Sequence, residues 1–123
     1  YALAAARLAF IDAGLDLGST GRETGVILDT SGELETQFRF FAPLEREGPA
    51  GVMPFLFPAM LANAATSSVA VQFGLKLVSK CFGGCFPCGE EAVCEAYGHL
   101  STRSPGAILA GGVRGDGPGR GMR

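Results

Sequence analysis

The sequence predicts an α/β fold with a layered, mostly parallel sheet. Two uninterrupted apolar runs, at 25–28 and 107–112, and a shorter apolar segment at 77–82 are typical of buried strands. Segments rich in helix-forming residues precede and separate these runs. Parallel neighbours in a sheet need a helix-sized connection, so this alternation favours parallel strands between layers of helices.

Length and composition limit the kinds of protein this can be. The chain has 123 residues, of which 47% are hydrophobic, so it is one domain, or part of one, with a packed core. Its net charge of −2 offers no basic face, and we expect no nucleic-acid partner. Residues 48–75 carry no charge and are long enough to cross a bilayer of about 30 Å. Prolines and polar side chains interrupt this stretch, so we expect a buried helix and no membrane span.

The cysteine spacing indicates in which cellular compartment the protein resides. All four lie at positions 81 to 94, too close together for disulfides to hold a whole fold. The start of the chain shows no signal-peptide pattern. We therefore expect a cytoplasmic protein with reduced thiols.

The first part of the chain is predicted to form a helix, a turn and a strand. Strong helix formers fill residues 1–13, and Gly14 ends the helix. A polar turn at 19–23 leads to the strand at 25–28, which the polar residues at 29–32 should end.

The middle of the chain is predicted to be a surface loop followed by a second helix. Proline, glycine and charged residues at 43–51 favour the loop, and the segment at 38–41 stays open between helix and strand. The helix should run from Phe57 to Phe73, where Gly74 ends it.

A strand, a tight turn and a helix are predicted over 79–100. Gly83 and Gly84 permit the sharp bend, and Pro87 suits the first turn of a helix. Backbone N–H groups converge at such a turn, which is a good place for a nucleophile or an anion. The apolar residues of the helix fall at the spacing of one buried face: Ala92, Val93, Ala96, Tyr97 and Leu100.

The end of the chain has a different composition. Residues 113–123 are rich in glycine and arginine and show no apolar period, so we expect a disordered tail after a domain at 1–112.

Several segments together resemble a known family. The chain resembles the N-terminal half of the β-ketoacyl-acyl carrier protein synthases, the thiolase-fold condensing enzymes of fatty acid and polyketide synthesis. The resemblance implies a layered thiolase-like fold of which this chain forms the N-terminal half only. The residues that carry it are IDAGL at 11–15, GVILDTSG at 25–32, PFLFPAMLAN at 54–63, FGLK at 73–76, Gly89 with Ala92 and Val93, and LAGG at 109–112.

The register of this resemblance places Phe86 where the family has its nucleophilic cysteine, three residues before Gly89. A phenyl ring cannot form a thioester. The family's other catalytic residues belong to a C-terminal half, and His99, the only histidine, matches none of them. The resemblance is then to chain-length factors, which lack the cysteine and pair with an intact ketosynthase. It implies a non-catalytic subunit in a homodimer or heterodimer, an acyl carrier protein as partner, and no cofactor.

A second interpretation keeps the chain an active condensing enzyme with a displaced nucleophile. Cys85 and Cys88 flank the substituted position, and thiols near a helix N-terminus ionise more readily. No positioned base accompanies them in the sequence, so the non-catalytic interpretation is preferred.

A third interpretation is an iron–sulfur or zinc protein. Cys81, Cys85 and Cys88 have the C-x3-C-x2-C spacing that radical S-adenosylmethionine enzymes use for a cluster. The alternative, which we favour, is that these thiols and Cys94 act as small hydrophobic side chains, with no metal bound.

Overall fold

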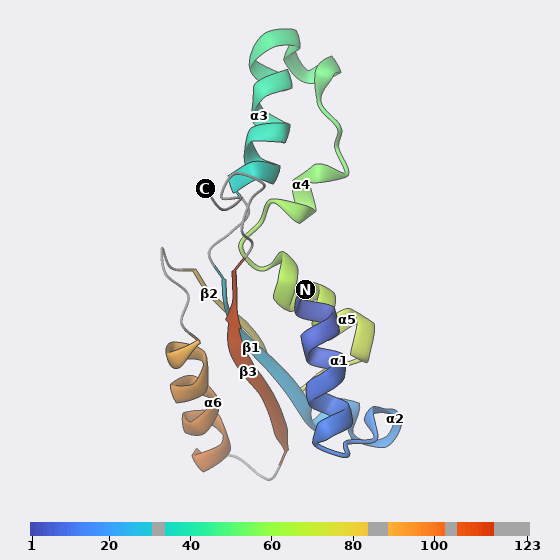
Figure 1. Cartoon of the computed structure of the whole chain (residues 1–123), viewed down its shortest axis with the longest axis vertical. Helices are drawn as coiled ribbons and strands as arrows, with labels where there is room; N and C mark the ends of the chain where they lie inside the picture. Colours follow the sequence, from blue (N-terminus) through green and yellow to red (C-terminus); the bar gives the residue numbers. More distant parts are fainter. Residues whose placement is uncertain (31–33, 84–88, 103–105, 115–123) are drawn as a thin grey trace, which may run out of the picture.

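A computed structural model describes residues 1–30, 34–83, 89–102 and 106–114. It contains a three-stranded sheet formed by β1 (Thr24–Thr30), β2 (Ser79–Gly83) and β3 (Ala107–Val113), in the order β2-β1-β3. Both neighbours run parallel to β1 (Figure 1). The predicted α/β architecture with a parallel sheet is therefore confirmed for this part of the chain.

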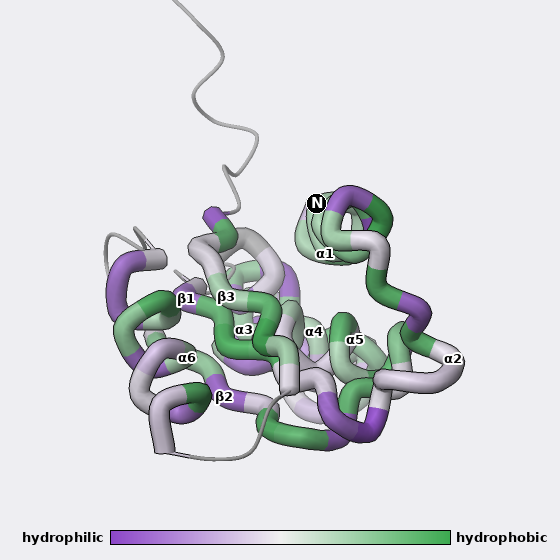
Figure 2. Tube along the Cα trace, turned by 90° about the horizontal axis from the view of Figure 1, so that it is seen from below, coloured by the Kyte–Doolittle hydropathy of each residue, from purple (hydrophilic) through white to green (hydrophobic). Residues whose placement is uncertain are grey.

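Helices cover both faces of the central strand. α1 (Ala2–Asp12) and α5 (Ala64–Phe73) lie on one face, and α6 (Glu90–Thr102) lies on the other (Figure 1). Figure 2 shows the same arrangement end-on, with α1 and α6 on opposite sides of the sheet. Every residue of β1 is buried, which explains why its sequence is apolar without alternation.

The face toward α1 and α5 carries the larger apolar core. Val26 and Leu28 of β1 point to this side, because successive strand residues alternate between faces. Phe10 of α1 and Phe73 of α5 meet edge to face, with ring centroids 5.2 Å apart. Val69 of α5 is fully buried beneath them.

On the opposite face of the sheet, α6 packs through small residues. Ile27 of β1 packs against Ala92 and Ala96 of α6. Gly89, just before this helix, has φ +78°, and a Cβ there would lie 2.5 Å from the backbone nitrogen of Gly112. α6 therefore begins in direct backbone contact with β3.

An arm extends beyond the carboxyl ends of the strands (Figure 1). It consists of α3 (Leu34–Glu47), the 3-10 turn η2 (Gly48–Gly51) and α4 (Leu56–Ala59). Phe40 joins its two sides, with its ring centroid 5.9 Å from that of Phe57. Elsewhere, the short helix α2 (Leu17–Thr20) and the turn η1 (Gly21–Glu23) connect α1 to β1. Among the described helices, none has the length and apolar character to cross a membrane.

The single helix predicted from Phe57 to Phe73 is wrong. The structure divides it into α4 and α5 with a turn at 60–63. Tertiary hydrogen bonds to the carbonyl of Ala62 replace the bonds that a continuous helix would have made.

Two other boundaries also differ from the prediction. The loop predicted at 43–51 is the last turn of α3, which contains Pro43, followed by η2. Proline fixes a helical φ, and the next residues favour a helix until Gly48, at φ +71°, ends it. β1 does not stop at Asp29 either, because β2 and β3 still pair with it at Thr30.

The predicted buried face of α6 is only partly correct. Ala92 and Ala96 are buried, but Val93, Tyr97 and Leu100 are exposed, Tyr97 by 75%. The helix lies against the sheet along a narrow row of alanines, so the wider apolar stripe faces away from it. The residues of the structure that are described leave this stripe uncovered.

Candidate functional site at the carboxyl end of the sheet

The three parallel strands end side by side next to the arm. Thr30, the last residue of β1, is level with Gly83 of β2 and Val113 of β3. α6 starts at the same edge, through the contact of Gly89 with Gly112. In open α/β sheets, ligands bind outside the carboxyl ends of the strands.

The predicted nucleophile position belongs to this edge by its place in the chain. Cys85, Phe86 and Cys88 lie outside the described residues. The connection that contains them leaves β2 at Gly83 and reaches α6 at Gly89.

Cys81 lies in a polar cluster under this edge. Its thiol lies 3.2 Å from the carbonyl oxygen of Ala62 and 3.2 Å from that of Phe82, two acceptors for its one proton, and 3.4 Å from the hydroxyl oxygen of Thr30. The Thr30 hydroxyl donates to the carbonyl of Ala62 at 2.8 Å. We call Thr30, Ala62 and Cys81 the clasp. Sequence reasoning considered Cys81 only as a metal ligand or a hydrophobic side chain and missed this role.

The metal hypothesis gains no support from the described part of the chain. There, no group of three or more histidine, cysteine, aspartate or glutamate residues is placed to hold a metal ion. Cys81 and Cys94 are free thiols. The other two cysteines of the proposed ligand set lie outside the described residues.

Asp29 is a buried carboxylate on the central strand. It is 6% exposed, and its Oδ1 has no hydrogen-bond partner in the structure. Because it is two residues from Ile27, it faces the α6 side of the sheet, level with Phe82 and Gly112. An unpaired buried carboxylate destabilises a fold, so this residue is a candidate for interaction with a group outside the described residues. The sequence showed it only as a polar residue after an apolar run.

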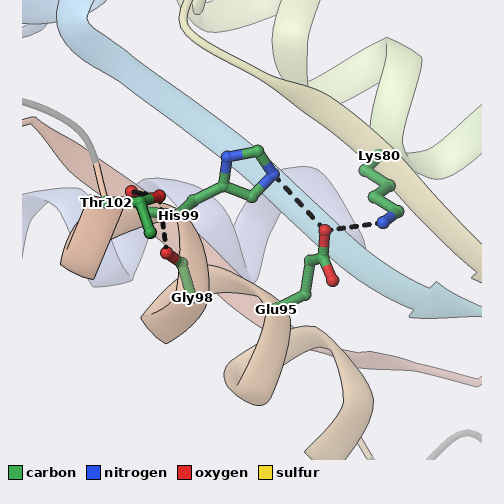
Figure 3. A network of polar contacts seen from close by, with 5 residues as sticks. All are labelled: Lys80, Glu95, Gly98, His99 and Thr102. Carbon is green, nitrogen blue, oxygen red and sulfur yellow. Dashed lines mark hydrogen bonds and ion pairs between the residues drawn. The ribbon is translucent and has the colours of Figure 1, made fainter.

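Polar contacts also join β2 to α6 (Figure 3). The Lys80 ammonium donates to Oε1 of Glu95 at 2.6 Å, and Nε2 of His99 lies 3.4 Å from the same oxygen. The hydrogen bond from Lys80 is the main cause that lowers the pKa of Glu95 below its usual value of 4.5, and the charges of Lys80 and His99 act in the same direction. The nitrogen of Lys80 also lies 5.0 Å from the ring centre of Phe82.

An open groove of about 660 Å³ lies between β2 and the adjacent flank of α6. Phe82 of β2 and six residues of α6 line it, among them Cys94, Glu95 and His99. Cys94 is exposed, whereas the sequence predicted a thiol that acts as a small hydrophobic side chain. Glu90 and Glu91, in the first turn of α6, are exposed.

The chain is similar to curated proteins over nearly its whole length. It is 30% identical over 115 residues to the 3-oxoacyl-(acyl-carrier-protein) synthase 2 of Staphylococcus aureus. It is 28% identical, also over 115 residues, to the protein of the same name from Synechocystis sp.. Each match covers 92% of this chain but 28% of the relative, so the chain spans little more than a quarter of the length of these curated relatives. No family model matches the chain. The similarity confirms the resemblance predicted from the sequence motifs: the chain is a relative of the β-ketoacyl-acyl carrier protein synthases.

Proposed function

We propose that this chain is a β-ketoacyl synthase-like subunit of fatty acid or polyketide chain assembly that does not itself catalyse condensation. One observation carries the proposal: in a chain similar to these synthases over 92% of its length, the motif register that ends at Gly89 puts Phe86 where the family is expected to have its nucleophilic cysteine. A phenyl ring provides no atom that can accept an acyl group. His99 contacts Glu95 late on α6 and does not supply the missing chemistry.

The proposed architecture is a thiolase-like layered fold, with a domain at 1–112 and a tail at 113–123. The parallel sheet with helices on both faces supports it. The proposed partners are an intact ketosynthase and an acyl carrier protein. The exposed apolar side chains on the outer side of α6, Val93 at 55% and Tyr97 at 75%, support a role in association.

β2 is the proposed edge for association with a ketosynthase. The N–H of Val26 donates to the carbonyl of Val78 at 2.8 Å, so in a parallel pair Val78 and Lys80 bond to β1. Ser79 and Cys81 therefore direct their backbone groups away from β1. Such an unpaired row is a template for another strand.

The catalytic part of the proposal is tested by incubation with a mass-tagged acyl thioester. We expect no acyl adduct on Cys85 or Cys88. The exposed thiol of Cys94 provides an internal measure of non-specific acylation. A stable adduct on Cys85 or Cys88 that exceeds this background, and disappears when that cysteine is changed to alanine, would show that the chain is an active condensing enzyme.

The association is tested by sedimentation and by pull-down with an intact ketosynthase. Ser79→Pro removes an outward N–H at the first residue of β2, where proline is tolerated, and should weaken the complex. Ser79→Ala keeps that N–H and is the matched control. Phe82→Lys is a poorer probe, because Phe82 packs against the cluster around Ile27 and its loss would also disturb the fold. Equal binding by both Ser79 variants would exclude this edge.

A further inference from the structure

Within the described part of the chain, the strongest contacts of α3 are to other parts of the arm. α3 packs mainly against η2 and α4, which are parts of the arm itself. The side-chain amide of Gln37 donates to the carbonyl of Met60 at 3.4 Å, which ties α3 to the end of the arm. The arm also exposes large aromatic side chains, with Phe38 and Phe55 each 71% exposed. The packing within the arm therefore does little to fix the position of the arm relative to the sheet.

The clasp joins the end of the arm to two strands at once. Ala62 lies in the turn between α4 and α5, where its carbonyl needs a partner that no continuous helix supplies. Thr30 of β1 donates to it at 2.8 Å, and the thiol of Cys81 on β2 lies 3.2 Å from it, with the carbonyl of Phe82 as a second acceptor at the same distance. Gly83 lies beside the same residue, since a Cβ built there would be 4.0 Å from that of Ala62. Thr30 ends β1, Cys81 is the middle residue of β2, and Gly83 ends β2, so the attachment involves both strands near their carboxyl ends.

We propose that the arm, residues 34–61, is a hinged element and that the clasp of Thr30, Ala62 and Cys81 is the catch that fixes its position. With both donors present, the arm stands out from the carboxyl end of the sheet as in Figure 1. Without them its attachment to the sheet is weaker and it opens more often. This inference does not depend on the proposed function, because it concerns the movement of the arm and not what the chain binds.

Tryptic cleavage after Arg39 and Arg46, both exposed on α3, measures how often the arm opens. A 14-residue helix with little packing is marginal by itself, so its protection follows the attachment of the arm. In Thr30→Val with Cys81→Ala we expect cleavage at these sites to be faster by roughly tenfold, the effect of losing about one net hydrogen bond. Amide hydrogen exchange should rise by a similar factor in α3 and α4 and stay unchanged in β1.

Matched variants separate the catch from general destabilisation. Thr24→Val removes a buried hydroxyl at the other end of the same strand, where it donates to the carbonyl of Thr20 at 2.9 Å, and should leave cleavage of the arm unchanged. Thr30→Ser and Cys81→Ser keep a donor at each position and should restore slow cleavage. Cys81→Ala alone removes the weaker donor and should give a smaller acceleration, a measurement that remains if Thr30→Val does not fold. Unchanged cleavage in Cys81→Ala, or equal acceleration by Thr24→Val, would overturn the proposal.

Discussion

The two faces of the sheet differ in how completely the described residues cover them. On one face, α1 and α5 bury Val26 and Leu28 together with the aromatic pair of Phe10 and Phe73. On the other face, α6 alone covers Ile27 through two alanines, while Asp29 is left without a hydrogen bond at Oδ1. The first face is an ordinary closed core. The second has features that a further layer of protein would satisfy: exposed apolar residues on the outer side of α6 and a buried carboxylate with one oxygen that has no partner among the described residues.

The largest effect should come from truncating the closed core. Phe10→Ala removes a ring that is 5% exposed and should lower the free energy of unfolding by about 3–5 kcal/mol. Tyr97→Ala, on the outer side of α6, should change it by less than about 0.5 kcal/mol in the isolated chain. Urea denaturation of both variants measures the contrast. A large loss on truncating Tyr97 would mean that the second face is already covered and that the two faces do not differ as described.

A smaller but still large effect is expected where α6 meets β3. Gly89→Ala adds a Cβ at φ +78° and 2.5 Å from the backbone of Gly112, so it combines backbone strain with overpacking. We expect a loss of about 2–4 kcal/mol in unfolding free energy. Gly14→Ala is the matched control, since φ there is +64° and its Cβ would meet no atom within 4 Å. Its cost should be about 1–2 kcal/mol. If the two substitutions cost the same, the close approach of α6 to β3 contributes nothing.

Asp29 tests the second face directly. Asp29→Asn keeps the shape and removes the charge, so in the isolated chain it should raise the free energy of unfolding by about 1 kcal/mol. Asp12→Asn, at an exposed position of α1, should leave it unchanged. Destabilisation by Asp29→Asn would show that the carboxylate already has a partner that supports the fold.

The sequence predicted the parts of this molecule that local rules decide. The central buried strand and the first helix with Gly14 after it follow from apolar runs, helix propensity and helix-end preferences. The errors lie where distant residues act. The break between α4 and α5 depends on Thr30 and Cys81, which are far from it in the chain, and no pattern within 57–73 records their bonds to Ala62.

The site shows the same division between local and distant information. Family register pointed to Phe86 and Gly89, and the strand-turn-helix pattern pointed to the edge where they belong. The sequence pattern did not reveal that Asp29 is buried, because the burial of Asp29 depends on the pairing of β1 with strands that lie more than fifty positions later. Periodicity also failed to show which side of α6 faces the sheet, because alanines and larger apolar residues both fit its 3.6-residue repeat.

The smallest effect concerns the polar link between β2 and α6 on the second face. The hydrogen bond from Lys80 lowers the pKa of Glu95 below 4.5, so Lys80→Met should raise that pKa toward 4.5. A carboxyl whose pKa is lowered by folding stabilises the folded state above its unfolded pKa, and this contribution disappears as the pH falls through the lowered value. The Glu95 and Lys80 side chains are both partly exposed to solvent, so the contribution should be small and should weaken further with added salt. Titration of the Glu95 side-chain carboxyl followed by NMR measures the shift, with His99→Gln as a control that should move it less, because Lys80 makes the shorter contact. An unchanged Glu95 titration in Lys80→Met would mean that β2 and α6 are joined by apolar packing alone. The two faces of the sheet would then differ in the size of their apolar cores and not in the type of interaction that holds their helices.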